Sequence, residues 1–311
     1  MNKRLIGLHC FNWTFNGIKE NAEKIKESGY DYILVSPVQG QKEMDWEWFW
    51  LYQPLGFRFI DNILGTKEEY ESMIKACNDI GLKVVQDVVL RHTASCDTDC
   101  LKPHCKVDDE IKNRYDFYTH SENNNGNMDR WHTTHDQFGL PMVDYNNKEL
   151  QEIQREFLHY LKSVGVSGVR VDMGKHFALP SEGSDWWNNV ILAEFKNGFN
   201  FAECIDCDKY ILDQYTQFIK VFSNRDCSDK SKMISFIMSH DTEETWLSTK
   251  NKTRDIIINE WRWLLQNNKE SDMLFYPRKF DDLWCSDIIK EINKQYKELL
   301  KILKLMIDKI N

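Results

Sequence analysis

A repeated unit of helix, glycine and strand constrains the fold of this chain more than any other feature. Glycine tolerates the left-handed conformation that ends many helices, and it is followed each time by a run of largely apolar residues. The unit occurs three times: 18–28 with Gly29 and DYILVSP, 66–80 with Gly81 and KVVQDVVL, and 147–164 with Gly165 and VSGVRVD. Strands that are apolar throughout are typical of sheets covered on both faces. The repeat therefore predicts a parallel sheet with crossover helices.

Further strands decide between an open sheet and a closed barrel. Eight segments qualify: 4–10, 31–36, 83–89, 166–172, 199–204, 217–222, 232–238 and 272–277. Eight parallel strands that alternate with helices form the (β/α)8 barrel, so we predict this α/β fold. The last helix, 286–310, has one apolar stripe with lysines between, which is typical of a helix that covers the barrel.

One connection is much longer than the others. The segment between the strand that ends near Leu90 and the helix that starts near Asn147 is rich in Asn, Asp, His and Cys. Long loops after barrel strands lie on the catalytic face. We therefore predict a barrel formed by 1–92 and 146–311, with a small irregular lobe at 93–145 inserted after the third strand.

Composition excludes several classes of protein. Hydrophobic residues make up 41% of the chain and aromatic residues 13%, which is enough for a large core and excludes a disordered protein. No apolar run approaches the roughly 18 residues of a membrane span, and the first residues are too polar for a secretory signal. The formal net charge of −9 argues against nucleic-acid binding. We expect a cytoplasmic globular protein whose oligomeric state is open.

The chain has nine cysteines, an odd number that does not favour a disulfide framework, so we expect reduced thiols. Four potential metal ligands lie in one short segment: Cys96, Cys100, His104 and Cys105. Thiolate and imidazole groups suit zinc, but their spacings are not those of paired structural sites. Whether these residues bind a metal stays open.

Charged and polar side chains gather where the predicted strands end. They are Arg91 and His92 after the third strand, Arg170 and Asp172 on the fourth, Glu203 on the fifth, and His240 and Asp241 after the seventh. An apolar barrel mouth would not crowd three carboxylates unless a site used them. Retaining glycoside cleavage needs two carboxyl groups about 5–5.5 Å apart. The aromatic segment 46–54 could stack on sugar rings, or simply pack in a loop.

These residues form motifs, and with them the chain resembles the α-amylase family of glycoside hydrolases along nearly its whole length. The motifs occur in the family's order: Tyr52-Gln53-Pro54, Asp87 to His92, Leu140 to Asp144, Gly168 to His176, Glu203, and His240-Asp241. The resemblance implies that Asp172 is the nucleophile, that Glu203 is the acid and base, and that Asp241 binds the hydroxyls of the reacting sugar. It implies that Arg170 orients Asp172 and keeps it ionised.

The resemblance also implies further substrate contacts. They would come from Tyr52, Gln53, His92 and His240 around the reacting ring, and from Lys175 and His176 on the leaving-group side. An α-glucan oligosaccharide would be the substrate, with no cofactor.

The chain departs from the family in three ways. Arg91 stands where an Asn usually helps to bind a structural calcium, so we predict that a guanidinium replaces the ion and that the calcium site is lost. The chain ends with the eighth barrel helix and lacks the family's C-terminal β-sandwich, which favours short, soluble glucans. The stretch from Glu203 to Asp241 is short, which favours an open groove.

We therefore predict a retaining glycosidase that cleaves α-1,4-linked maltodextrins. Two alternatives stay open: an α-glucan transglycosylase, in which a sugar replaces water as the acceptor, and a glucan-binding barrel that has lost catalysis. Chain-length preference, endo or exo action, and tolerance of α-1,6 branches are not decided by the sequence.

Overall fold

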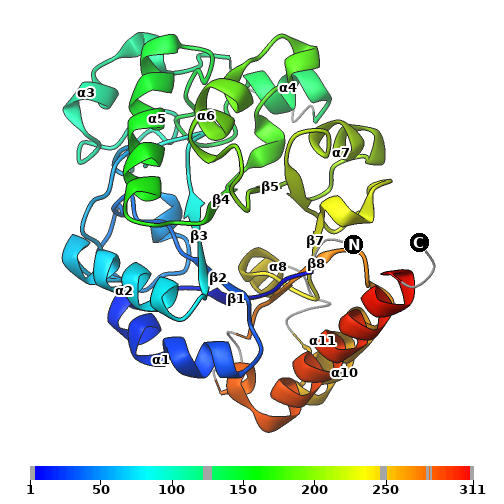
Figure 1. Cartoon of the computed structure of the whole chain (residues 1–311). Coiled ribbons are helices and arrows are strands. Elements are labelled where there is room, and N and C mark those ends of the chain that lie inside the picture. Colours follow the sequence, from blue (N-terminus) through cyan, green and yellow to red (C-terminus); the bar gives the residue numbers. More distant parts are fainter. Residues whose placement is uncertain (1–3, 122–127, 246–250, 278–279, 281, 309–311) are drawn as a thin grey trace.

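Eight parallel strands close into one barrel (Figure 1). The computed structural model describes residues 4–121, 128–245, 251–277, 280 and 282–308. The strands are β1 Ile6–Cys10, β2 Tyr32–Val35, β3 Lys83–Val88, β4 Gly168–Val171, β5 Phe201–Glu203, β6 Lys220–Phe222, β7 Met233–Ser235 and β8 Asp272–Phe275. Each strand pairs with the next, and β1 pairs with β8 to complete the circle. The predicted (β/α)8 fold is confirmed, with every strand inside its predicted range.

The helices cover the outside of the barrel. They are α1 Phe15–Glu27, α2 Lys67–Asp79, α3 Asp109–Lys112, α4 Arg130–His135, α5 Lys148–Ser163, α6 Ala193–Phe195, α7 Lys209–Tyr215, α8 His240–Thr245, α10 Arg254–Asn267 and α11 Asp287–Asp308. Thr66 and Glu69 form a reciprocal capping box at the start of α2. The glycine that follows this helix, Gly81, has a φ of +68°, as its predicted role in ending the helix requires.

The barrel interior is layered because successive inward residues on a strand are two positions apart. One buried apolar cluster fills its middle: Tyr32, Leu34, Val85, Phe201, Phe222, Ile234 and Leu274. A second and larger cluster lies between the strands and the covering helices. Asp87 follows Val85 by two residues on β3, and Glu203 follows Phe201 by two residues on β5. The layer next to the mouth is therefore charged.

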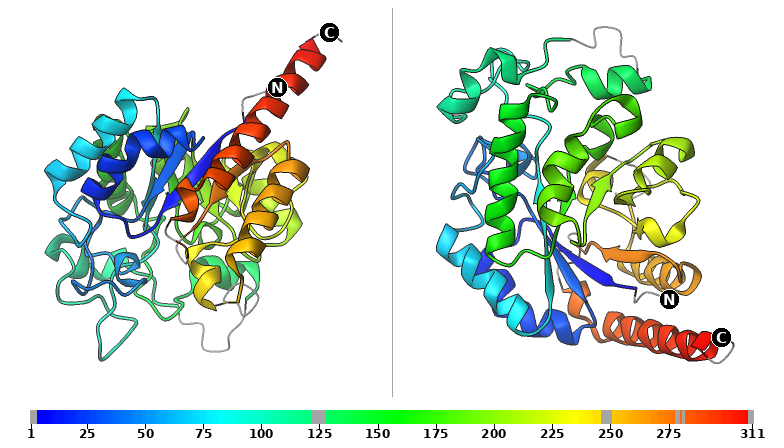
Figure 2. Two further views of the ribbon diagram at one scale, coloured as in Figure 1. Left: turned by 90° about the horizontal axis from the view of Figure 1, so that it is seen from below. Right: turned by 45° about the horizontal axis from the view of Figure 1, so that its top comes forward.

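Residues 93–145 follow β3 and contain only short helices in their described part, α3 and α4 among them. Isolated bridges hold the segment together and tie it to the end of β3, including His92 with Met142 and Tyr118 with Val143. Figure 2 shows α3 and α4 on the same side of the barrel. The division of the chain into a barrel and a separate lobe stays a prediction.

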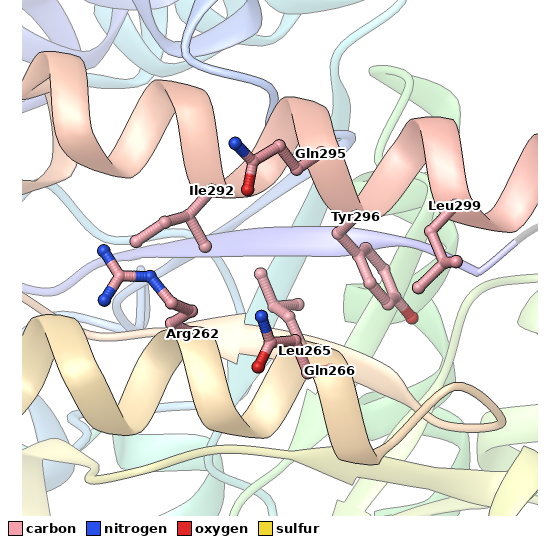
Figure 3. A pocket seen from close by; sticks show the side chains of 7 residues that line it. All are labelled: Arg262, Leu265, Gln266, Ile292, Gln295, Tyr296 and Leu299. Atoms are coloured by element: carbon pink, nitrogen blue, oxygen red, sulfur yellow. The ribbon is translucent and has the colours of Figure 1, made fainter.

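The last helix, α11, packs along α10 through Ile292, Tyr296 and Leu299. Figure 3 shows these side chains facing Leu265 across a small pocket of about 100 Å³. The C-terminal turns of α11 extend beyond the rest of the molecule (Figure 2). No helix within the described ranges combines the length and the apolar character that a membrane crossing requires.

We predict that Gly168→Ala destabilises the protein by about 1–3 kcal/mol. A Cβ at this position would lie 2.2 Å from the carbonyl oxygen of Phe199, and a backbone atom cannot move aside as a flexible side chain can. The free energy of unfolding in urea measures the effect. The neighbouring Ser167→Ala is the control, since it keeps the hydrogen bond from the Ser167 N–H to Val84 and should change stability by less than about 0.5 kcal/mol. Equal stability of the two variants would contradict the prediction.

Candidate active site

One buried guanidinium organises the mouth of the barrel. Arg170 on β4 donates to both carboxylate oxygens of Asp87, at 2.8 and 2.7 Å, and to Oδ1 of Asp172 at 3.1 Å. Its other terminal nitrogen lies 3.1 Å from Oε1 of Glu203. The Arg170 side chain is only 2% exposed, and that of Asp87 is not exposed at all. A single cation therefore holds carboxyl groups from β3, from β5 and from the end of β4 itself.

The turn after β4 fixes the second oxygen of Glu203. Met173 has a φ of +51°, the left-handed conformation that non-glycine residues rarely adopt, and its N–H donates to Oε2 of Glu203 at 3.0 Å. The next residue, Gly174, lies so close to β5 that a Cβ there would be 2.7 Å from the Cβ of Ala202. The backbone between Asp172 and Glu203 is thus packed tightly, and it holds the two carboxyl groups in fixed relative positions.

Asp241 reaches the same cluster from the residues after β7. Burial raises the pKa of its carboxyl, while interactions with Arg170 and Glu203 oppose the rise. His240 lies beside it, with Nε2 at 3.3 Å from Oδ2 of Asp241. The mouth therefore brings together the three carboxyl groups that the sequence singled out.

Aromatic rings form one wall of this mouth. The His240 ring is stacked with Phe11, at 4.5 Å between ring centres, and with Tyr52, at 5.0 Å, and the Phe11 and Tyr52 rings lie 6.4 Å apart. His9 meets His240 edge-on at 5.3 Å. The Tyr52 hydroxyl donates to Oδ2 of Asp87 at 2.7 Å, which joins the aromatic wall to the charged cluster.

The crowding of carboxyl groups changes their acidity. Burial raises the pKa of Asp87 to about 6, although Arg170 and Tyr52 both oppose the rise. Burial also raises the pKa of Asp172 well above its usual value, with Arg170 acting in the opposite direction and Glu203 adding to the rise. The pKa of Glu203 is likewise raised by burial. Because one guanidinium cannot neutralise all these carboxylates, the cluster retains a proton at higher pH than separate carboxyl groups would.

The other predicted site residues bind main-chain atoms near this cluster. They are His92, which bonds the carbonyl of Tyr52 at 2.9 Å, Lys175, which donates to that of Ile205 at 2.8 Å, and His176, whose Nδ1 lies 2.8 Å from that of Thr133. The side-chain oxygen of Gln53 accepts from the N–H of Ser95 at 2.9 Å. These residues hold the surrounding loops in place, and the structure joins none of them directly to the carboxyl cluster.

Sequence reasoning gave no role to two members of the site, Asp87 and Phe11. A signal for Asp87 was present, because Asp87 on β3 stands opposite Arg170 on β4 in the strand register, and two buried opposite charges in adjacent strands form a pair. Phe11 had no comparable signal, since an aromatic residue directly after a strand is equally typical of ordinary packing.

Arg91 binds three main-chain carbonyls at the junction between β3 and residues 93–145. Its guanidinium donates to the carbonyl of Val143, to that of His176 at 3.0 Å and to that of Thr134 at 3.0 Å. The residue is 1% exposed, and its guanidinium lies 4.9 Å from the ring of Tyr145. Calcium requires several oxygen ligands, main-chain carbonyls among them. Here the guanidinium takes the carbonyls, so the residues present do not fit a calcium ion.

A second arginine, Arg130 on α4, clamps the loop after β4. It donates to the carbonyls of Lys175 and Phe177 and forms an ion pair with Glu182 at 2.7 Å. Arg91 and Arg130 therefore both tie residues 93–145 to the loop that follows Asp172.

All nine cysteines lie in the described ranges as free thiols, and Cys10 and Cys77 are buried. Within the described part of the chain, no group of three or more His, Cys, Asp or Glu side chains could hold a metal ion. That part includes the segment with Cys96, Cys100, His104 and Cys105.

Comparison with known proteins is consistent with this geometry. Residues 12–275 match the family described as "Alpha amylase, catalytic domain". An alpha-amylase from Clostridium acetobutylicum is 26% identical over 92% of this chain, which spans 42% of that relative. One from Aeromonas hydrophila is 29% identical over 69% of this chain, which spans 51% of it. The crystal structure of an Anoxybacillus alpha-amylase superposes with a TM-score of 0.75 at 14% identity, covering 95% of this chain and 79% of the other.

We predict that Arg91→Gln lowers the free energy of unfolding by at least about 2 kcal/mol, because buried carbonyls lose their donor. Urea denaturation measures the loss. Arg155→Gln is the matched control, since the partly exposed Arg155 of α5 forms its ion pair with Glu152, three residues before it. It should change stability by less than about 0.5 kcal/mol.

Urea denaturation in the presence of a calcium chelator gives a second readout. The unfolding midpoint of the wild-type protein should not change when calcium is removed, because the guanidinium is part of the chain. A midpoint that falls with the chelator, or an Arg91→Gln variant as stable as Arg155→Gln, would contradict this account.

Proposed function

The chain belongs to the α-amylase family of glycoside hydrolases, and from this premise we propose that it cleaves α-1,4-glucosidic bonds in maltodextrin-type oligosaccharides with retention of configuration. One observation carries the proposal. Asp172 and Glu203 are bound to the two terminal nitrogens of the same guanidinium, so the two carboxyl groups lie close together. A short separation is what retaining cleavage needs, because a carboxylate and not a water attacks the sugar.

Asp172 attacks the anomeric carbon in the first step. Its carboxylate forms an ester bond to that carbon as the bond to the leaving glucosyl oxygen breaks. The hydrogen bond from Arg170 supports this role, because it favours the ionised form of a carboxyl whose pKa burial raises. In the second step water attacks the same carbon, the ester bond breaks, and the α configuration is restored.

Glu203 moves the proton in both steps. It gives its proton to the leaving oxygen and then takes one from the attacking water. Burial and the neighbouring charge of Asp241 both raise its pKa and support a protonated starting state. The Met173 N–H on its other oxygen keeps the carboxyl in one orientation between the two steps.

The remaining groups bind the reacting sugar. Asp241 and His240 offer an acceptor and an imidazole to its hydroxyls, and the stacked face of Tyr52 offers an apolar platform. Asp87 acts through Arg170 and Tyr52 as a positioning residue, since its carboxylate binds both.

We predict that proton NMR of maltoheptaose incubated with the wild-type protein shows new α-anomeric ends, and that Asp172→Asn and Glu203→Gln slow their appearance by at least about 100-fold. Glu194→Gln is the control, since Glu194 binds His159 on the outside of the barrel. It should keep wild-type activity. Circular dichroism confirms that each variant is folded.

Other products would distinguish the alternatives. Longer oligomers would show transfer to a sugar acceptor, and line broadening without turnover would show a binding protein. New β-anomeric ends, or full activity of Asp172→Asn, would overturn the proposed mechanism.

We predict a bell-shaped pH profile of kcat/KM. Activity falls as the pH drops and Asp172 becomes protonated, and it falls again as the pH rises and Glu203 loses its proton. The positive charge of Lys175 lowers the pKa of Glu203. Lys175→Met should therefore raise that pKa and move the alkaline limb to higher pH. Lys209→Met, which changes an exposed lysine on α7, should leave both limbs in place. An alkaline limb that moves down in Lys175→Met would contradict the assignment of Glu203 as the acid.

A further inference from the structure

The barrel has a second mouth, where its strands begin, and a pocket of about 280 Å³ lies there. It is lined by residues that precede or open strands: Arg4, Leu5, Phe199, Lys220, Ser231, Lys232 and Asp272. Parallel strands all begin at the same edge of the sheet. The pocket is therefore separated from the Arg170 cluster by the apolar layer that fills the barrel.

Two of the charged residues in the pocket neutralise each other. Lys220, the first residue of β6, lies 2.8 Å from Oδ2 of Asp272, the first residue of β8. Lys220 also donates to the carbonyl of Ser231 at 2.6 Å, and Oδ1 of Asp272 accepts from the N–H of Leu5 at 2.8 Å. The pair therefore closes the base of the barrel and adds no net charge.

Arg4 and Lys232 are not neutralised in this way. Neither has a carboxylate within ion-pair distance among the residues that the structure describes. The Nη1 atom of Arg4 makes one long hydrogen bond, 3.4 Å, to the carbonyl of Ser231. Its Nε is buried, and no hydrogen-bond partner for it is found in the described part of the chain. Both cations lower the pKa of Asp229, whose carboxylate accepts the Ser231 N–H.

Lys220 and Asp272 neutralise each other, and Asp229 is the one further carboxylate on which both Arg4 and Lys232 act among the described residues, so this region carries a net positive charge on a chain whose formal net charge is −9. The flexible lysine and the planar arginine fork differ in what they can bind. A guanidinium binds a tetrahedral oxyanion through two parallel N–H groups, and an ammonium adds a compact point charge.

We propose that this pocket binds a small phosphate, either inorganic phosphate or a phosphate monoester. Arg4 donates from its terminal nitrogens to phosphate oxygens, and Lys232 faces the same group. An anion matches the net positive charge of the pocket. The side chains of Leu5 and Phe199 provide apolar surface for the organic part of an ester, and Phe199 is held in place by its contact with Tyr32, at 4.8 Å between ring centres.

Isothermal titration calorimetry of the full chain with inorganic phosphate, glucose 6-phosphate and glucose tests the proposal. We expect both phosphates to bind at millimolar or lower concentration, and glucose not to bind at this site. Arg4→Gln and Lys232→Gln should each raise the Kd at least about tenfold, the loss expected for one charge-assisted hydrogen bond. Lys230→Gln is the matched control, because Lys230 lies two residues before Lys232, outside the pocket, and pairs with Asp226.

The outcomes separate the two sources of phosphate. Tighter binding of glucose 6-phosphate than of inorganic phosphate would identify an ester as the ligand, and equal binding would identify the free ion. The proposal is overturned if neither phosphate binds below about 10 mM, or if the Arg4→Gln and Lys232→Gln variants bind as tightly as Lys230→Gln. Binding is read directly, so the result does not depend on whether the chain cleaves glucans.

Discussion

The burial of the Arg170 guanidinium is the constraint on which the rest of the site depends. A cation that is removed from water must be paired, and Arg170 is paired by carboxyl groups from three strands or their ends. Of these, only Asp87 is wholly buried, and it also holds the Tyr52 hydroxyl. Above its pKa of about 6, Asp87 can therefore balance the arginine while Asp172 and Glu203 change protonation.

The same barrel interior explains why its two ends can carry different chemistry. Strand alternation places charged residues at both ends and apolar residues between them, because inward positions recur every second residue. At the base, Lys220 and Asp272 form one neutral pair. At the mouth, one arginine faces several carboxyl groups. Because the apolar layer separates the two ends, the cations at the base cannot form ion pairs with the excess carboxylates at the mouth.

Sequence reasoning recovered the parts of the structure that local patterns encode. Helix periodicity, the glycine that ends each helix and the apolar runs predicted all eight strands, and each strand is shorter than its predicted range. Partners far apart in the chain were harder to predict. The sequence placed Arg91 where a cation is needed, but the three carbonyls that it binds lie 43 to 85 residues away. Similarly, the motif around His176 gives no sign that its ring binds the carbonyl of Thr133.

Long-range contacts also connect residues 93–145 to the loop that follows Asp172. Arg91 and Arg130 both bind carbonyls in the loop that follows Asp172, and that loop begins with the left-handed Met173. A left-handed residue persists only where its surroundings hold it, and here its N–H must point at Glu203. A covalently attached cation cannot dissociate as a metal ion can, so this support does not vary with the concentration of any ion. The relative positions of Asp172 and Glu203 thus depend on arginine side chains that lie outside the carboxyl cluster.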